Sequence, residues 1–377
     1  RLHAATWRSN IIMQQLGEIL HRHEVWSRVH RYQAVNERIF LPFCDLRARQ
    51  QGVPTSTLRS TALRCIPANQ IIIEDKTSQT IKSFEFERVF HEPEAAANHL
   101  SSLVKSTIGG RSSVFFAFTQ QYNELSSSIF MGQNGGQLSA LQTPENDSGL
   151  PARMVEELIR QQNGLQNEIS INIEVSMLEI HDSKITDLLS DEFDAENWQQ
   201  HRIRLSGADA RSNPPVQKRD VPSAAQLSEH LDFASQRRLM LSHQSYRRLG
   251  INSHVLLTLH IKHTWLKGGH EVSSKLHFFD LVVLPRTTLA ERRQPSEAAA
   301  LFRRSQYVAL HGVRTVLMAL LKGKRFVPYR EHPSTHFLKP TLETPCTVIL
   351  LSCLNENCHP DVAHNLLRCA SYFFIRR

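Results

Sequence analysis

The sequence predicts an α/β fold, a three-layer sandwich in which helices flank a mixed central β-sheet. Short apolar runs of strand length alternate with longer segments whose apolar residues recur at helical spacing. The chain has 377 residues, of which 41% are hydrophobic, and this is ample for a proper core. No internal repeat is visible, so we expect one domain over residues 37–377, preceded by a helix over residues 1–36.

Strands are expected where apolar and β-branched residues gather between turn signals. Pro42 favours an irregular or edge position for the first strand, because proline cannot donate a backbone hydrogen bond. Residues 169–189 are expected to form a strand followed by a helix. The other expected strands cover residues 39–44, 71–73, 84–89, 114–118, 255–263, 275–284 and 347–354.

Helices are expected where apolar residues recur every three or four positions, as in residues 153–162 and 223–238. Residues 133–151 and 191–222 are rich in turn-forming residues and are expected to be loops. A further helix has its core face at Leu310, Val313, Val316, Leu317 and Leu320.

The formal net charge of +8 implies an acidic partner surface, which could be nucleic acid, an anionic membrane or an acidic protein. Composition does not choose among these. The chain has no apolar run of about 20 residues and no signal peptide at its start. It begins with Arg1 rather than methionine, so we expect a fragment of a longer protein.

The six cysteines lie mostly in apolar strand-like or helical contexts, which is typical of reduced, buried thiols in an intracellular protein. Cys353, Cys358 and His359 could instead be metal ligands. A fourth ligand at conventional spacing is lacking, so no metal site is expected.

The most informative stretch is an apolar run over residues 114–118 that ends in a polar turn. A phosphate-binding loop would lie at such a strand end, and it needs glycines and a lysine followed by Ser or Thr. No glycine occurs between Thr119 and Met131, and no lysine occurs in residues 106–183. The sequence therefore predicts the strand and turn of a nucleotide-binding site without the glycines and the lysine that would bind phosphate.

Several segments resemble the kinesin motor family and follow one another in the family's order. The strongest match is residues 175–189, which read VSMLEIHDSKITDLL where the family has VSYLEIYNEKIYDLL. The resemblance implies the kinesin motor fold. The other matching segments are FEFERVF at residues 84–90, Phe116-Ala117-Phe118 with Gln120 at the strand before the phosphate loop, and VPYR at residues 327–330.

Three segments depart from the family where the resemblance implies that ATP would bind. The glycine-rich loop is missing, the first switch motif retains only Ser253 and His254, and the second retains its aspartate but loses its glycine and glutamate. Nucleotide hydrolysis depends on positioned charges, so we expect no catalytic residue, no cofactor and no ATPase activity. The degenerate positions are Thr119, Gln120, Tyr122, Leu125, Gly250, Ile251, Asn252, Asp280, Val283 and Pro285.

Asp280 could still hold a metal ion through water, but a structural role as a cap or loop hydrogen-bonder is favoured. We also expect Tyr122, Leu125 and residues 282–284, which are larger and more apolar than the family's residues, to fill the space of the absent phosphates.

The resemblance implies a microtubule-binding surface near the C-terminal end, because the family binds the acidic surface of tubulin there. From Leu320 to Arg377 eight Lys and Arg residues face four Asp and Glu residues, a net charge of +4. Without the resemblance, such a run is most often a solvated face. Changes from the family at residues 331–333 could alter the affinity. The residues expected to bind microtubules are Lys322, Lys324, Arg325, Arg330, Lys339, Arg303 and Arg304.

Residues 1–36 carry apolar residues at coiled-coil spacing, at Ile12, Leu16, Ile19 and Trp26. They could form an amphipathic helix that packs on its own domain, or the end of a coiled-coil neck. The second interpretation matches the kinesin-14 class, in which a coiled coil enters the motor from its N-terminal side and the chain ends soon after the last helix.

We therefore expect a non-catalytic domain that resembles the non-ATPase partner subunits of fungal kinesin-14 heterodimers. The resemblance implies binding to microtubules, a coiled-coil heterodimer with a catalytic minus-end-directed kinesin-14, and no nucleic-acid or membrane partner. It also implies a place on microtubules, at the spindle or spindle pole, in cytoplasm or nucleus, and a role in mitosis or karyogamy. The alternatives are a divergent but active ATPase motor and a kinesin-derived scaffold that does not bind tubulin.

Overall fold

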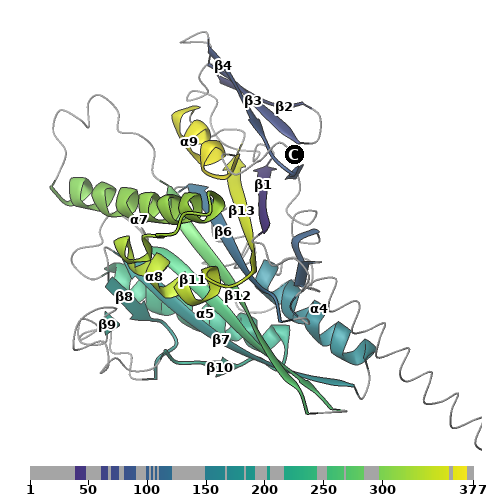
Figure 1. Cartoon of the computed structure of the whole chain (residues 1–377). Helices are drawn as coiled ribbons and strands as arrows, with labels where there is room; N and C mark the ends of the chain where they lie inside the picture. The colour runs from purple at the N-terminus through teal and green to yellow at the C-terminus, as the bar shows by residue number, and fades with distance from the viewer. Residues whose placement is uncertain are drawn as a thin grey trace, which may run out of the picture.

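The elements of the chain are described in a computed structural model (Figure 1). The structure describes residues 39–47, 61–66, 69–75, 80–90, 99–101, 103–104, 107, 110–120, 149–165, 168–181, 184–191, 202–203, 216–243, 253–266, 269–283, 297–355 and 360–371. The strands are β1 (Ile39–Arg47), β2 (Thr61–Ile66), β3 (Gln70–Asp75), β4 (Thr80–Glu85), β5 (Arg88–Phe90), β6 (Ser112–Gln120), β7 (Ile169–His181), β8 (Lys184–Asp187), β9 (Arg202–Ile203), β10 (Arg219–Asp220), β11 (His254–Trp265), β12 (Glu271–Val283) and β13 (Cys346–Asn355). The helices are α4 (Leu150–Gly164), α5 (Ala224–His243), α7 (Glu297–Leu321), the 3₁₀ turn η5 (Tyr329–Glu331), α8 (Pro333–Leu342) and α9 (Pro360–Ser371).

Ten of the strands within these ranges form one mixed sheet, in the order β5-β1-β13-β6-β12-β11-β7-β8-β9, with β10 paired to β7. The strands from β5 to β12 are parallel to one another, whereas β11, β7, β8 and β9 pair in antiparallel fashion. Strands β2, β3 and β4 form a separate antiparallel sheet. The mixed central sheet is as predicted.

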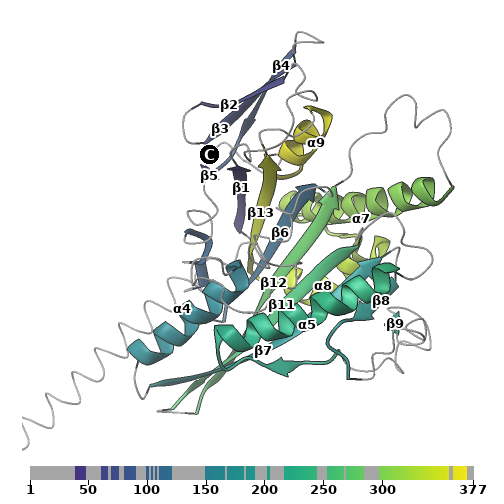
Figure 2. The same ribbon diagram turned by 180° about the vertical axis from the view of Figure 1, so that it is seen from behind.

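Helices cover both faces of the large sheet, so the molecule has three layers. Figure 1 shows α7, α8 and α9 over one face, and Figure 2 shows α4 and α5 over the other. Alternate side chains of β6 enter the two cores: Phe116 and Phe118 pack with α7, α8 and α9, whereas Phe115 and Ala117 pack with α4 and α5. Burial on both faces explains why the central strand is an unbroken apolar run.

Most predicted elements are confirmed, including the helix core face at residues 310–320, which packs into the first of these two cores. Pro42 pairs with Leu350 of β13, and the pairing of β1 with the short strand β5 begins only at Phe43. Pro42 thus has the edge-like position that its missing N–H favours. None of the helices in the described ranges is long and apolar enough to cross a membrane.

The predicted helix at the end of residues 169–189 is wrong, because residues 184–187 form strand β8, which pairs with β7. The β-branched residues Ile185 and Thr186 fit a strand. The Asp187 carboxylate then accepts hydrogen bonds from the backbone N–H of Leu189 (2.9 Å) and of Gln217 (2.7 Å). These bonds hold the chain in a turn where a helix would have continued.

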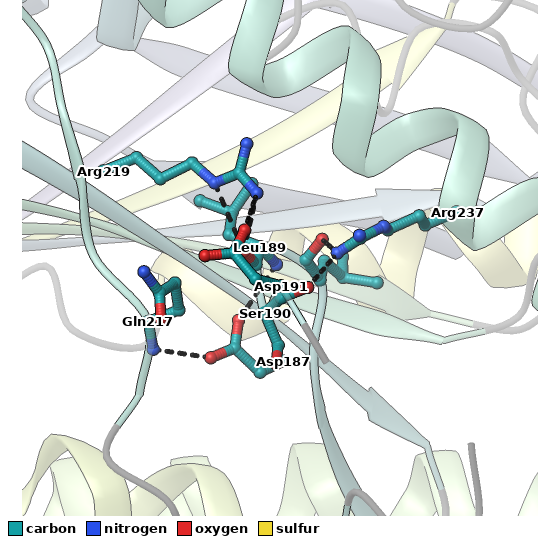
Figure 3. A network of polar contacts seen from close by, with 8 residues as sticks. Asp187, Leu189, Ser190, Asp191, Gln217, Arg219 and Arg237 are labelled. Carbon is teal, nitrogen blue, oxygen red and sulfur yellow. Dashed lines mark hydrogen bonds and ion pairs between the residues drawn. The ribbon is translucent and has the colours of Figure 1, made fainter. Parts of the chain in front are cut away.

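Two arginines complete the polar network around this turn (Figure 3). Arg219 donates to the carbonyl oxygen of Leu189 and to the Asp191 carboxylate at 2.7 Å. Arg237 of α5 donates to the carbonyl oxygens of Leu188 (2.9 Å) and Ser190 (2.6 Å). The turn is thereby tied to β10 and to the second half of α5, so the network has a structural role.

A buried histidine joins the sheet to the helical layer that carries α8. His277 of β12 has one ring nitrogen 2.8 Å from Thr258 Oγ1 of β11 and the other 2.8 Å from Thr341 Oγ1 of α8. Burial is the main reason that the pKa of His277 falls to about 3. Burial likewise lowers the pKa of His260, His263 and His332 to about 4. These imidazoles are therefore neutral in the folded protein at pH 7.

We expect the free energy of unfolding to be highest above about pH 6.5 and to fall as the pH drops toward about 4, because the unfolded chain binds more protons in this range. Each of the four histidines contributes up to about 1.4 kcal/mol per pH unit to this slope. Urea denaturation at several pH values measures it. His277→Gln should make the slope shallower than in wild type, and His270→Gln at an exposed position serves as the substitution control. Equal slopes for His277→Gln and wild type would contradict the assignment.

Candidate functional site

The carboxyl end of β6, at Thr119 and Gln120, lies at a switch point of the sheet. Strand β6 runs between β13 and β12 and is parallel to both. The next described helix after β6 is α4 on one face, whereas the helix after β13 is α9 on the opposite face (Figures 1 and 2). In open α/β sheets, ligands bind at strand ends where neighbouring connections go to opposite faces. The fold therefore provides the position of a ligand site here.

The register of the sheet brings two of the degenerate segments together at this end, those at the ends of β6 and β12. Asp280 of β12 pairs with Ala117 of β6 on one side and with Val255 of β11 on the other. Val283 pairs with Gln120. The described positions from two distant motifs are thus neighbours in space, and β11, which follows the first switch motif, is paired with β12 beside them. Tyr122, Leu125, Gly250, Ile251, Asn252, Leu284 and Pro285 lie outside the described residues. The proposed filling of the phosphate space by Tyr122, Leu125 and residues 282–284 therefore stays a prediction.

Asp280 is the acidic side chain that the sequence retains at this place. It is half-buried, and its position in β12 puts it on the same face as Phe278, whose ring packs in the core with α4 and α5. No group of three or more His, Cys, Asp or Glu side chains in the described ranges could hold a metal ion. Cys346 and Cys353 are buried free thiols, as predicted, and Cys358 and His359 lie outside the described residues.

The retained serine of the first switch is held by a buried carboxylate. Ser253 donates its hydroxyl hydrogen to Glu179 Oε1 of β7 at 2.5 Å. Arg238 of α5 donates to the Ser253 carbonyl oxygen (3.3 Å) and hydroxyl (3.2 Å), and its Nε lies 3.8 Å from Glu179 Oε1. Sequence reasoning missed this cluster, although Glu179 stands in the best-matching motif. The cluster fixes the start of β11 from inside the protein.

Four cations between the end of α7 and η5 form an exposed group that we call the basic surface. Within the part of the chain that the structure describes, none of them makes an ion pair, so their charges face solvent. A negatively charged partner could therefore pair with them without breaking an internal contact. The basic surface consists of Lys322, Lys324, Arg325 and Arg330.

The turn after α7 sets the shape of the basic surface. Gly323 has a φ of 59°, Gly323 N–H donates to Leu320 O (3.1 Å) and Lys324 N–H donates to Ala319 O (2.9 Å). These two bonds are the Schellman motif, which ends a helix through a left-handed residue. Gly323 therefore stops α7 and turns the chain so that Lys322 and Lys324 flank the turn.

A close contact packs α7 against the N-terminal end of α8. A Cβ atom on Gly312 of α7 would lie 2.9 Å from the Cβ of His332, so only glycine lets the two segments approach this closely. His332 is the N-cap of α8, and its Nδ1 accepts a hydrogen bond from Ser334 N–H at 3.3 Å. The departure from the family at residue 332 therefore has a structural role.

The remaining residues that were expected to bind microtubules differ from the basic surface. Lys339 is half-buried, and its Nζ lies 3.6 Å from Glu343 Oε1 and 6.0 Å from the centre of the Tyr329 ring. Arg303 and Arg304 lie in α7, but their side chains are outside the described part of the structure. The coiled-coil positions Ile12, Leu16, Ile19 and Trp26 also lie outside it.

The sequence and the fold of this chain are similar to those of several known proteins. The sequence model of the kinesin motor domain matches residues 49–371. The C-terminal motor and motor homology domain of Kar3Vik1, fused to a synthetic heterodimeric coiled coil, superposes with a TM-score of 0.71 at 19% identity, covering 98% of this chain and 94% of that one. The motor domain of the Kar3-like kinesin from Ashbya gossypii gives 0.64 at 19% identity, covering 88% and 98%. The fold is therefore that of a kinesin motor.

Sequence relatives agree with this fold. Kinesin-like protein KIN-14P of Arabidopsis thaliana is 24% identical over 74% of this chain and 26% of its own length. Kinesin-like protein KIN-14C of Oryza sativa subsp. japonica is 24% identical over 95% of this chain and 36% of its own length. Because the family model covers most of the chain, the chain belongs to the kinesin motor domain family. It spans about a quarter to a third of these curated relatives.

We expect Gly323→Ala to lower the free energy of unfolding by about 1 kcal/mol, because alanine is strained at a positive φ although nothing lies within 4 Å to clash with it. Gly323→Asn should cost less, since asparagine tolerates this conformation better. Chemical denaturation measures both. The control is Gly164→Ala at the end of α4, where the space is also open and φ is not positive, and where alanine favours the helix. Equal effects at the two glycines would contradict the role of Gly323.

Proposed function

We propose that this chain is a kinesin-14-like motor-homology domain that binds microtubules without using ATP. Residues 1–36 would join it through a coiled coil to a catalytic kinesin-14 subunit, to which it gives a second microtubule attachment. Force from the partner's ATP hydrolysis would pass through the shared coiled coil. This function places the protein on microtubules, at the spindle or spindle pole.

The observation that carries the proposal is the composition of the strand end at Thr119 and Gln120. Phosphates are bound by backbone N–H groups that glycines expose and by a lysine that reaches the β- and γ-phosphates. The sequence that follows has no glycine up to Met131 and no lysine up to residue 183. Loss of a single preorganised stabiliser often lowers a rate by about 10²–10³-fold. The combined loss of lysine, arginine and glutamate therefore favours a domain without ATPase activity.

The fixed start of β11 also supports a role that does not depend on nucleotide. The motif's arginine and its Mg²⁺-binding serine are absent, and the remaining Ser253 is bonded to Glu179. A hydroxyl engaged with a buried carboxylate contributes to the fold without a phosphate or metal. The contact gives Ser253 a structural role that does not depend on the absent serine and arginine of the first switch motif.

Two observations support the two proposed partners, the microtubule and the catalytic subunit. The basic surface is exposed and free of ion pairs in the described ranges, and the family binds the acidic surface of tubulin with the corresponding elements. In the Kar3Vik1 structure a motor and a motor homology domain are fused to a synthetic heterodimeric coiled coil, which is compatible with a paired arrangement here. Positive charge that is not used within the fold can attract an acidic filament over about a Debye length.

The purified chain should co-sediment with microtubules to the same extent with ATP, with ADP and without nucleotide, because no γ-phosphate is sensed. It should also release no phosphate above the rate of microtubules alone. A catalytic kinesin-14 motor domain serves as the positive control for release. ATP-dependent detachment or microtubule-stimulated phosphate release by this chain would instead identify a divergent but active motor.

Charge reversal separates the microtubule-binding proposal from the scaffold alternative. The double variant Lys324→Glu and Arg325→Glu should raise the Kd for microtubules roughly tenfold or more at low salt, because it replaces attraction by repulsion. Lys82→Glu, an exposed lysine on β4 in the small sheet, is the matched control and should bind like wild type. If the double variant kept full cellular function after losing microtubule binding, a scaffold would be the better description.

A further inference from the structure

A large aromatic side chain is exposed in the middle of the basic surface. Phe326 is 78% exposed, more than any other large hydrophobic side chain in the described part of the chain. A hollow of about 640 Å³ lies against it, lined by Met318, Ala319 and Pro328 together with cationic side chains. A second hollow of about 460 Å³ is also lined by Phe326 and includes Val327 and Tyr329. An exposed aromatic residue between two shallow hollows can insert into a partner while the partner fills the hollows.

Phe326 is held in place by anchored segments on both sides. Before it, Lys324 N–H is bonded to Ala319 O, which fixes the end of α7. After it, Tyr329 is buried, and its N–H donates to Val327 O at 2.9 Å. Only a few residues separate these fixed points, so little conformational freedom remains to be lost on binding. Preorganised contacts of this kind strengthen association.

The charges around Phe326 indicate what kind of partner fits. Lys324 lines both hollows, and Lys322 and Arg325 each line one of them. Glu331 lines the first hollow and Glu343 the second, so cations predominate around the ring. An aromatic residue inside a charged rim is the usual arrangement of a binding hot spot, because the rim excludes water from the apolar contact. The matching surface is acidic at its rim and has an apolar depression at its centre.

We propose that Phe326 is an apolar anchor that inserts into the surface of polymerised tubulin, while Lys322, Lys324 and Arg325 pair with the acidic side chains around it. This inference rests on the proposed function. It attributes to Phe326 the contribution to microtubule affinity that does not depend on charge. The basic surface then provides attraction that salt weakens, and Phe326 provides contact energy that salt leaves almost unchanged. Neither contribution needs ATP.

The test measures microtubule co-sedimentation by the full chain at two salt concentrations, about 0.05 M and about 0.2 M, between which the Debye length falls. Phe326→Ala should raise the Kd roughly tenfold at both concentrations, whereas Phe326→Trp should bind nearly as well as wild type. Lys324→Ala should weaken binding more at the lower salt. Ile81→Ala, which removes a 71% exposed side chain from β4, is the matched control for loss of an exposed apolar group.

Thermal unfolding of each variant checks the fold, and the exposed Phe326 side chain should be removable without loss of stability. If wild type binds microtubules and Phe326→Ala binds equally well at both salts, the anchor is overturned while the proposed function stands. An effect of Phe326→Ala that disappears at the higher salt would also overturn it. If wild type itself fails to co-sediment at low salt, the proposed function fails and the anchor with it.

Discussion

The structure depends above all on the burial of β6 on both faces of the central sheet. Every side chain from Ser113 to Phe118 is buried, and neighbouring rings belong to opposite cores. Phe115 stacks on Phe278 of β12 with ring centres 4.9 Å apart, and Phe116 lies 5.9 Å from Phe279. Because both faces of β6 are packed in a core, the position of its carboxyl end in the sheet does not depend on the residues that follow it. The fold can therefore form whether or not these residues bind a nucleotide.

This separation explains how a kinesin fold can persist after the nucleotide motifs have changed. The two hydrophobic cores lie above and below the sheet, and the described degenerate positions Thr119, Gln120 and Val283 lie at strand ends. At the start of β11, Ser253 is bonded to the buried carboxylate of Glu179, a contact that involves no ligand. These contacts within the protein are consistent with the proposal that the fold needs no bound triphosphate. Its exposed cations and Phe326 remain available for a partner.

Most of the architecture could be predicted from the sequence because strands buried on both faces and amphipathic helices leave clear patterns. The helix expected before Leu189 was wrong because the turn at Asp187 is closed by backbone groups of Gln217, 30 residues further on. Such long-range hydrogen bonds leave no local signal. The cluster of Glu179, Arg238 and Ser253 was missed for the same reason. The basic surface was predicted from charge and resemblance, but the exposure of Phe326 follows from the turn after α7 and needed the structure.

In the division of roles that we propose, this chain holds the filament and a partner supplies the chemistry. This proposal requires that the strand ends at β6, β11 and β12 no longer bind a nucleotide. Isothermal titration calorimetry of the purified chain with Mg-ATP and with Mg-ADP tests this most directly, with a catalytic kinesin-14 motor as control. We predict no measurable heat of binding for this chain at concentrations that saturate the control. A saturable, magnesium-dependent isotherm with one nucleotide per chain would contradict the account.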